Sequence, residues 1–438
     1  MRKDKIMFKL ILKTLWFRRH RNGWLLAELI VVCIVSWAIF DPVVVVTHDR
    51  MIPLGYDADR LCLVSLNVFR PNAPGFDRQA TDSASLVRAY DNLVQRVRNY
   101  PEVKHVTPIL GWLYPNSQGQ GVMTRMPVED TIPCRMRYIE FLPHTQFFET
   151  YGFRPGNGMT LEELSDYPYK DGDLVLSENT LETFFHTDNP QGCRFWQIHS
   201  KDTLYTDVVG TTGTFRMYSD WQPIPVAFVP MNSIDLSYFP SDVKILVRLE
   251  EGVSMDRFLH RFHPWMVREL RAGNLYAQKV ESYQQLITNR EYKTGTMTLY
   301  QRNVAMAVFF LINLCLGVSG TFWVQTRNRR EEVGIMLSYG ATRGAIVRFL
   351  LGEGIVLTTV STLVGCLFYL QYAISEGLAQ GQTGMETTGS YWVHNFGLHF
   401  FIVSFIIYLI LLVVVLVGIY IPARKISAIS PTDALRDE

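Results

Sequence analysis

The sequence predicts a membrane protein with four transmembrane α-helices and a large α+β extracytoplasmic domain inserted between spans 1 and 2. Four apolar runs are long enough to cross a bilayer, which takes about 20 residues. The stretch between the first two runs alternates short strand-like and helix-like patterns instead. Apolar residues make up 48% of the chain, which fits a polar domain joined to a few spans better than a chain embedded in lipid throughout.

The four predicted spans are residues 24–46, 304–324, 345–372 and 398–421. The first run could be mistaken for a signal peptide, but it is longer than the apolar region of such a peptide. In addition, no small-residue cleavage pattern follows it. We therefore interpret the first run as an uncleaved anchor.

Lysine and arginine in the short flanking segments predict the orientation of the spans. Residues 1–23 carry eight Lys or Arg against one acid, and segments 325–344 and 422–438 carry four and three further Lys or Arg. Segment 373–397 contains no Lys or Arg. Because basic flanks stay in the cytoplasm, both termini are predicted to be cytoplasmic, with 47–303 and 373–397 on the periplasmic side.

The N-terminal segment 1–23 contains an amphipathic pattern over residues 6–19, with apolar side chains on one face and basic ones elsewhere. Such a helix can lie on the inner leaflet or simply continue into the first span. We favour the helix on the leaflet. Glu28, within the first span, is assigned no function.

Two strand–helix–strand units are predicted in the segment 47–303. The first has strands at 60–69 and 103–110 around a helix at 83–100, which Asp82 or Ser83 can cap. Apolar residues recur in this helix at spacings of three and four.

The second unit has a strand at 243–250, a helix that starts at Met255 and is perturbed at Pro264, and a short strand at 276–280. Two such units predict helices covering one face of a sheet. From about Glu281 the chain is predicted to run as helix toward the second span.

A β-rich insertion is predicted between the two units, at about 115–230. Gly, Pro and short strand-like runs such as 173–176 and 205–209 indicate it. Several aromatic residues lie in this segment, and we interpret them as core residues rather than as a ligand cleft: Phe147, Phe148, Phe153, Phe184, Phe185, Phe195 and Trp196.

The sequence argues against most catalytic and metal sites. It has no G-x-x-x-x-G-K-[ST] motif to cradle a nucleotide phosphate and no G-x-S-x-G elbow. His260 and His263 are three residues apart on a predicted helix, but no third ligand is placed beside them, so no metal is predicted. Cys62, Cys134 and Cys193 show no C-x-x-C spacing, although one bridge among them stays open. We predict no catalytic residue, no cofactor and, at a net charge of +1, no nucleic-acid partner.

Glu353 lies a few residues into the third span. An acid within a span is a functional candidate by default, because burying its charge in lipid is costly. The alternative is an interfacial carboxylate paired with Arg348 or with the backbone. The sequence leaves these two interpretations equal.

Two sequence motifs resemble the permease subunits of MacB/FtsX-type ABC transporters. The first follows the pattern E-[IV]-G-[IL]-x-x-x-x-G-A-[TS]-[RK] after a basic run, with E-G further on. The second is a P-A-[RK]-[RK] motif followed by P-x-[DE]-A-L-R. In this chain the two motifs comprise Arg329, Arg330, Glu331, Glu332, Val333, Gly334, Ile335, Gly340, Ala341, Thr342, Arg343, Glu353 and Gly354, and then Pro422, Ala423, Arg424, Lys425, Pro431, Thr432, Asp433, Ala434, Leu435 and Arg436.

The segment between the first two spans is similar to the periplasmic core domain of the same family. The residues that carry this similarity are 173–178, Gly192 and 207–210. One residue departs from the family pattern: Leu337 stands where many members have a basic side chain.

The resemblance implies a non-catalytic permease subunit in a bacterial inner membrane, driven by a separate ABC ATPase subunit. It also implies a second permease subunit, identical or paralogous. A periplasmic adaptor and an outer-membrane channel are further partners of such machines. In the mechanism called mechanotransmission, ATP-driven closure of the ATPases moves the cytoplasmic loops, and stiff helices carry that motion to the periplasmic domains. The work would be export, efflux or extraction of a peptide, antibiotic, lipid or lipoprotein.

We hypothesise that residues 328–343 are the element that couples the permease to the ATPase. Glu331 and Glu332 suit the start of a short helix, because carboxylates complement its dipole. Gly340 permits the turn into the third span. The predicted coupling residues are Arg330, Glu331, Glu332, Gly334, Gly340, Ala341, Thr342 and Arg343, with Pro422, Arg424, Lys425, Pro431, Ala434, Leu435 and Arg436 in the C-terminal motif.

Two other functions stay open at this stage. A transmembrane regulator could use the same motion to activate a cell-wall hydrolase or a sensor. A membrane-anchored enzyme would need polar groups that converge in a pocket of the periplasmic domain.

Overall fold

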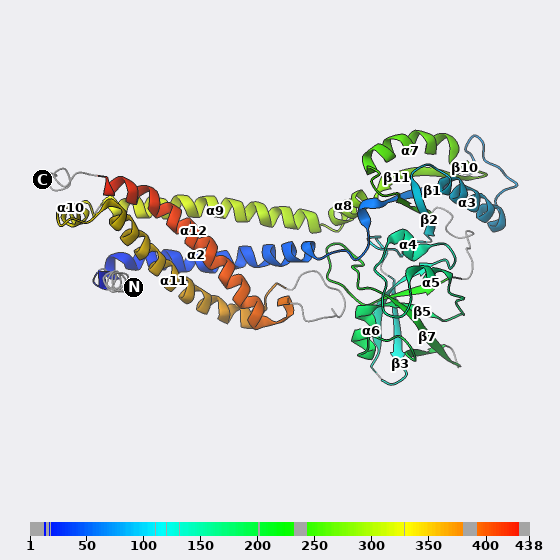
Figure 1. Ribbon diagram of the computed structural model, residues 1–438, viewed down its shortest axis with the longest axis horizontal. Coiled ribbons are helices and arrows are strands. Elements are labelled where there is room, and N and C mark those ends of the chain that lie inside the picture. The colour runs from blue at the N-terminus through cyan, green and yellow to red at the C-terminus, as the bar shows by residue number, and fades with distance from the viewer. Residues whose placement is uncertain are drawn as a thin grey trace. The chain divides into compact units, whose positions relative to one another are not determined.

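The computed structural model describes two compact units (Figure 1). We call residues 48–297 the inserted domain, and the described residues before 48 and after 297 the membrane domain. The description covers residues 13–14, 17, 19–109, 111–119, 121–130, 132–199, 202–231, 243–327, 329–379 and 392–428. Most of the predicted amphipathic helix at 6–19 therefore lies outside the described residues.

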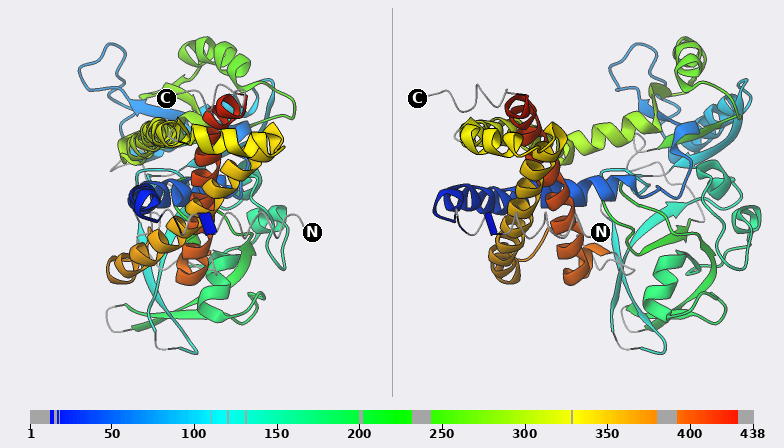
Figure 2. Two further views of the ribbon diagram at one scale, coloured as in Figure 1. Left: turned by 90° about the vertical axis from the view of Figure 1, so that its left-hand side faces the viewer. Right: turned by 60° about the vertical axis from the view of Figure 1, so that its left-hand side comes forward.

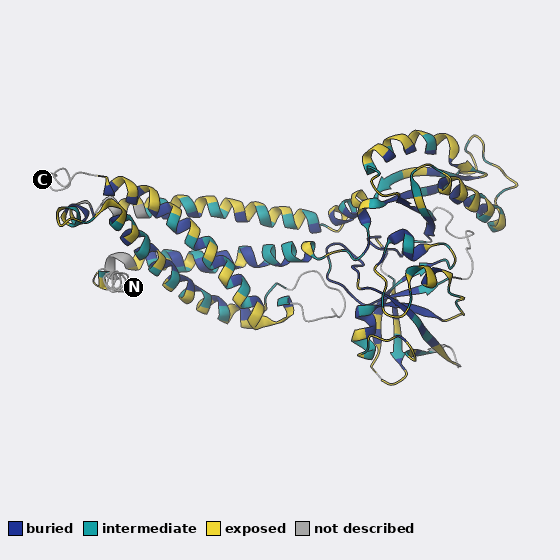
Figure 3. Ribbon diagram, in the orientation of Figure 1, coloured by how far each residue is buried: buried dark blue, intermediate teal, exposed yellow. Residues whose placement is uncertain are grey.

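Four helices of the chain are long and apolar enough to cross a membrane, which confirms the four predicted spans. Their large apolar side chains are exposed along much of their length, as on α9 at Phe309 and Leu316 (Figure 3). An apolar exterior is what a hydrocarbon environment requires of a spanning helix. The helices are α2 (Arg19–Met51), α9 (Thr296–Arg327), α11 (Arg343–Glu376) and α12 (Phe396–Ser427).

Small residues allow the membrane helices to approach closely. A Cβ added at Gly354 of α11 would lie 2.1 Å from Cδ1 of Ile419 on α12, and one at Gly365 would lie 2.7 Å from Cβ of Cys33 on α2. Helices α11 and α12 accordingly lie side by side (Figure 2). Close backbone approach of this kind is how helices associate in lipid, where the hydrophobic effect does not drive them together.

The inserted domain contains a five-stranded antiparallel sheet. Strand β1 pairs with β11 on one side and β9 on the other, and β2 pairs with β9. The β1–β11 register pairs Cys62 with Ser282. The two predicted strand–helix–strand units are thus interleaved, in the split order known from ferredoxin-like folds. The order is β10 (Arg271–Ala272), β11 (Leu275–Ser282), β1 (Leu61–Val68), β9 (Lys244–Leu249) and β2 (Val103–Ile109).

Two amphipathic helices pack against the sheet in one apolar cluster, α3 (Ser83–Arg98) and α7 (Met255–Glu269). The side chain of Asp82 caps α3 by accepting from the Ser85 amide. Helix α7 continues through Pro264, where the sequence predicts a perturbation. Phe258, Phe262 and Met266 are buried on one face of α7, and this packing on both sides of the proline outweighs the backbone hydrogen bond that proline removes.

The segment between the two units forms a closed six-stranded barrel in the strand order β3-β4-β8-β5-β7-β6. Phe147, Phe148 and Phe153 are buried in a shared apolar cluster, so they are core residues, as the sequence indicates. The strands are β3 (Val122–Pro127), β4 (Cys134–Phe141), β5 (Leu174–Ser177), β6 (Arg194–His199), β7 (Asp202–Thr212) and β8 (Val226–Pro230), with short helices α4 (Phe147–Tyr151), α5 (Leu161–Asp166) and α6 (Glu178–Phe185).

The helix predicted to run from Glu281 toward the second span is interrupted. Helix α8 (Tyr283–Lys293) is capped by Thr294, and α9 begins at Thr296. Between them Gly295 has φ +80°, a left-handed conformation that glycine adopts at little cost. The chain therefore turns at Gly295 instead of continuing as one stalk helix.

Candidate functional site

The predicted coupling segment folds as a short helix followed by a sharply defined turn. Helix α10 (Arg330–Ser338) has Glu331 and Glu332 in its first turn. At its end the amide of Gly340 donates to the Leu337 carbonyl, and the amide of Ala341 donates to the Met336 carbonyl, each at 3.0 Å. These two bonds form a Schellman motif, which satisfies the last carbonyls of the helix. The motif needs a left-handed residue, and Gly340 has φ +86°.

The next two residues start α11. The hydroxyl of Thr342 accepts from the Ala345 amide at 3.3 Å, which caps one of the free amides of the new helix. Arg343 is the first residue of α11 and is exposed. The run Gly340-Ala341-Thr342-Arg343 thus caps the end of α10 and begins α11.

Helix α10 has a buried face and an exposed face. Val333 and Gly334 are buried, and Met336, Leu337 and Ala341 pack against the apolar core of the membrane domain. Leu337, where the family often has a basic residue, is therefore part of this packing. The side chain of Arg330 lies outside the described part of the structure.

The exposed face of α10 carries a stripe of three residues, of which the predicted coupling residues included only Glu331. Glu331, Ile335 and Tyr339 are four residues apart, so they share one face. Ile335 is 48% exposed and Tyr339 is 89% exposed. Exposed tyrosine beside an apolar side chain is enriched at surfaces that bind another protein. The spacing of four was the signal available in the sequence.

A buried ion pair connects the start of α10 to α11. Arg329, which precedes α10, pairs with Glu353, and both side chains are about 5% exposed. Pairing with Arg348 was one of the alternatives left open for Glu353, and the structure pairs Glu353 with Arg329 instead. Residues five apart on a helix point about 140° away from one another, since each residue turns about 100°, and Arg348 donates to the Gly344 carbonyl instead.

The C-terminal motif is described only in part. Pro422 and Ala423 are buried within α12, whereas Arg424 and Lys425 are exposed. The Lys425 ammonium lies 4.9 Å from the ring centroid of Trp323 on α9, a cation–π distance. Pro431, Ala434, Leu435 and Arg436 lie outside the described residues.

A second buried polar pair in the membrane domain was missed from the sequence. Nε2 of His399 lies 2.7 Å from Oδ1 of Asp41, and Nδ1 lies 3.1 Å from the Val393 carbonyl. Both partners are hydrogen-bond acceptors, so each ring nitrogen faces an acceptor. The other carboxylate oxygen of Asp41 accepts from the Ala379 amide at 3.0 Å. An acid inside a predicted span, Asp41, was the signal that could have revealed this site.

The inserted domain has a pocket lined by ionisable groups beside α6, with a volume of about 590 Å³. Glu178, Glu182, His186 and Asp188 contribute to its wall. Within the described ranges, no group of three or more His, Cys, Asp or Glu side chains is placed to hold a metal ion. His260 and His263 are both exposed on α7.

Comparison with known proteins finds similarity to permeases, in line with four candidate spans and an inserted α+β domain. Residues 304–431 match the family described as FtsX-like permease C-terminal. Over 305 residues the chain is 24% identical to the macrolide export ATP-binding/permease protein MacB 1 of Aeromonas hydrophila subsp. hydrophila. This alignment covers 67% of the chain and 42% of the relative, so the chain spans about two fifths of that protein's length.

Two solved structures are similar to the chain at low scores. The periplasmic region of MacB from Actinobacillus actinomycetemcomitans matches at 11% identity and a TM-score of 0.30, covering 55% of this chain and 97% of that one. The extracellular domain of the ABC-type transporter YknZ from Gram-positive bacteria matches at 13% identity and a TM-score of 0.24, covering 50% and 100%.

The family match, the relative and the two sequence motifs agree with one another. All three resemble the permease part of MacB/FtsX-type ABC transporters, and the family match lies in residues 304–431.

Proposed function

We propose that this chain is the permease subunit through which a separate ATPase subunit does mechanical work across a bacterial inner membrane. The observation that carries the proposal is the division of α10 into two faces. One face packs into the membrane domain, and the other presents Glu331, Ile335 and Tyr339 to solvent. A bound protein can displace a helix held in this way, and the helix can transmit that displacement to the helices that contact it.

The contacts of α10 indicate which helices such a displacement would reach. Its start is tied to α11 by the Arg329–Glu353 pair, and its end is joined to α11 by the turn at Gly340. Because both ends of α10 are connected to α11, displacement of α10 moves α11 as a rigid body. Gly354 lies tightly against Ile419, so α12 follows.

The proposed orientation places α10 and both termini in the cytoplasm and the inserted domain in the periplasm. The basic flanks support this orientation. Two permeases, identical or paralogous, would pair so that each binds one ATPase subunit. The cargo would be a peptide, an antibiotic, a lipid or a lipoprotein, exported or extracted on the periplasmic side. A periplasmic adaptor and an outer-membrane channel are proposed as further partners.

The proposal predicts that Tyr339→Ala removes the ATPase from the permease. We expect the tagged wild-type chain, purified in mild detergent from its host, to bring down a nucleotide-hydrolysing subunit. The variant should retain less than a tenth of that subunit, because truncating an exposed aromatic anchor of an interface removes much of its binding energy. Quantitative mass spectrometry of the purified material measures the ratio.

The matched control is Tyr205→Ala, since Tyr205 is 58% exposed on β7 of the inserted domain and should leave the ATPase bound. Full retention of the ATPase by Tyr339→Ala would show that α10 is not its docking element. Absence of any ATPase from the wild-type preparation, with a hydrolase or a sensor kinase in its place, would replace the transporter with the regulator as the function of this chain.

A further inference from the structure

The inserted domain contains a pocket of about 550 Å³ that lies apart from α10 in the sequence and has no assigned role. Residues of β1, β9, β11 and α8, together with the segment 112–118, line it. Its volume is in the range of pockets that hold small organic molecules, which is about 300–1,000 Å³.

Positive charge predominates among the lining residues. Lys244, Lys279 and Lys293 line the pocket with one carboxylate, that of Glu281. Glu281 lies 2.6 Å from Nζ of Lys279, and Arg290, which also lines the pocket, is paired with Asp220. Concave surfaces with an excess of one charge concentrate ions of the opposite sign.

Aromatic and apolar surface lies beside these charges. Trp112 is 68% exposed and Tyr292 is 49% exposed, and both line the pocket. The ammonium of Lys244 lies 5.5 Å from the ring centroid of Tyr114. A site that combines cations with aromatic surface suits a ligand that has an anionic group joined to an apolar or aromatic body.

The wall of the pocket also contains buried polar side chains that are fixed in place. Oδ1 of Asn116 accepts from the Ser219 amide at 2.8 Å, and the hydroxyl of Ser117 accepts from the Gly119 amide at 3.3 Å. Nε of Arg290 donates to the Ser117 carbonyl at 3.3 Å. Groups held in this way present a rigid surface, so a ligand loses little free energy in ordering them.

We propose that this pocket binds an amphipathic organic anion, with its carboxylate or phosphate beside Lys244 and Lys293 and its apolar body against Trp112 and Tyr292. The ligand is recognised by charge together with aromatic contact. Its chemistry is shared by free amphipathic acids and by the headgroups of anionic lipids.

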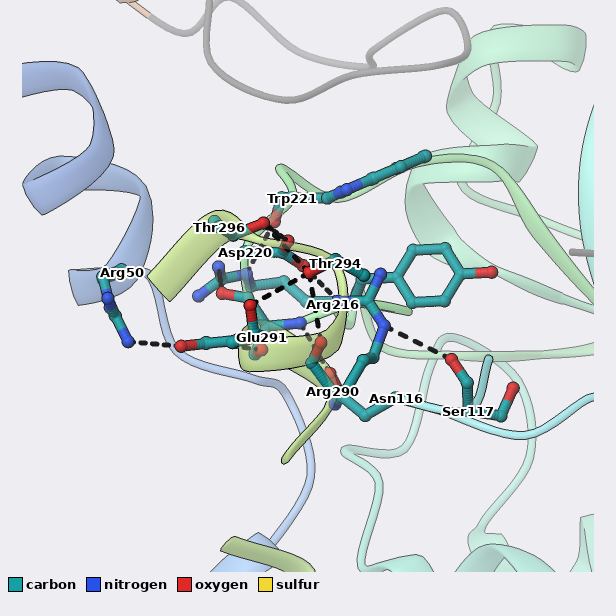
Figure 4. Close-up of polar contacts among 12 residues, drawn as sticks. Arg50, Asn116, Ser117, Arg216, Asp220, Trp221, Arg290, Glu291, Thr294 and Thr296 are labelled. Atoms are coloured by element: carbon teal, nitrogen blue, oxygen red, sulfur yellow. Dashed lines mark hydrogen bonds and ion pairs between the residues drawn. The ribbon is translucent and has the colours of Figure 1, made fainter. Parts of the chain in front are cut away.

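The pocket adjoins the polar network that holds the start of α9 (Figure 4). Helix α8 supplies Arg290 to the pocket, and the next residue, Glu291, pairs with Arg50 and accepts from the Ser219 hydroxyl at 2.8 Å. Asp220, the partner of Arg290, accepts from the Thr296 hydroxyl at 2.8 Å. A ligand that contacts α8 therefore acts on the residues that fix both chain segments leading out of the inserted domain.

The test uses the full-length protein in lipid nanodiscs and isothermal titration calorimetry with two probes. One probe is 1-naphthoate, and the other is 1-naphthalenemethanol, which has the same ring system without the charge. We expect saturable binding of 1-naphthoate, at least tenfold tighter than that of the alcohol. Each probe is also titrated into empty nanodiscs, and subtracting that heat removes the contribution of partition into lipid.

The variant that tests the charge is Lys244→Gln combined with Lys293→Gln. Glutamine at 244 keeps a donor for the Gly111 carbonyl, which Lys244 contacts at 3.3 Å. We expect at least a tenfold loss of affinity for 1-naphthoate and less than a twofold change for the alcohol. Lys104→Gln, an exposed lysine on β2, is the control and should bind both probes as the wild type does.

Equal affinity for the two probes, or wild-type affinity in the double variant, would overturn the proposal. If the double variant does not fold, Lys293→Gln alone decides the question, because Lys293 is exposed at the end of α8 and its loss should still weaken the binding of 1-naphthoate about threefold.

Competition by a short-chain anionic phospholipid but not by octanoate would identify a lipid headgroup as the source of the anion, and the reverse would identify a free acid. The readout is ligand binding, so its result does not depend on ATPase docking at α10.

Discussion

Two buried arginine–carboxylate pairs, one in each domain, differ in how completely their surroundings satisfy them. In the inserted domain, Arg290 pairs with Asp220, donates to the Ser117 carbonyl and lies 4.2 Å from the ring centroid of Tyr218. Asp220 also accepts from Thr296. In the membrane domain, Arg329 pairs with Glu353, but Nε of Arg329 has no hydrogen-bond partner among the described residues.

The difference indicates two separate uses of the same chemistry. A pair embedded in a fully connected network fixes one arrangement, because each alternative would leave several buried groups unsatisfied. A pair with an unsatisfied donor has less to lose when it rearranges. We infer that Arg290–Asp220 is a rigid connection, whereas the printed contacts of Arg329–Glu353 hold that pair less completely.

The largest expected effect comes from removing the carboxylate of the rigid pair. Asp220→Ala leaves the buried guanidinium of Arg290 without its partner, which should cost about 3–5 kcal/mol of folding free energy. Thermal and denaturant unfolding of the detergent-solubilised protein, followed by circular dichroism, measures the loss. Asp171→Ala, at an exposed carboxylate of the same domain, should change the stability by less than about 0.5 kcal/mol. A similar small change at Asp220 would contradict the rigid network.

A smaller loss is expected in the membrane domain. Glu353→Leu should cost about 1–3 kcal/mol for the unsatisfied partner, because the long side chain of Arg329 can reorient its head toward water. The double variant Arg329→Met/Glu353→Leu should recover most of this stability, since apolar replacements of a buried pair are often neutral. The same double variant should lose ATP-driven transport in reconstituted vesicles. A double variant that is stable and transports normally would show that the pair has no role in coupling.

The smallest effect is expected at the turn between α10 and α11. An alanine Cβ at Gly340 would meet no atom within 4 Å, so Gly340→Ala tests backbone conformation alone and should cost about 1–2 kcal/mol. Gly344→Ala is a matched control, because Gly344 also has open space around it and lies in helical conformation in α11. The control should be neutral or slightly stabilising. If the proposed coupling role is right, Gly340→Ala separates ATP hydrolysis from transport and Gly344→Ala does not.

The spans and the ends of α10 could be predicted from the sequence because local features determine them. Length and hydropathy identify a spanning helix, and the Gly-Ala-Thr run marks the end of one helix and the start of another. The amphipathic pattern of α3 was predicted in the same way, and its cap, Asp82, is one of the two residues proposed for that position.

The buried pairs and the pocket could not be predicted, because they depend on residues far apart in the chain. Glu353 pairs with Arg329 across the turn rather than with its neighbour Arg348. The pocket combines Trp112 with Lys244 and α8, which no local pattern connects. Closure of the barrel likewise depends on the parallel pairing of β4 with β8, two strands that the sequence separates by α4, α5, α6 and three other strands.

The register that pairs Cys62 with Ser282 brings the first and last long strands of the inserted domain together. The chain therefore enters and leaves the sheet at the same place, as it would in a simple hairpin. A domain built in this way is a removable module, since a short turn could replace it without separating the flanking segments. The same feature would allow the inserted domain to be exchanged for another domain while the membrane helices stay unchanged.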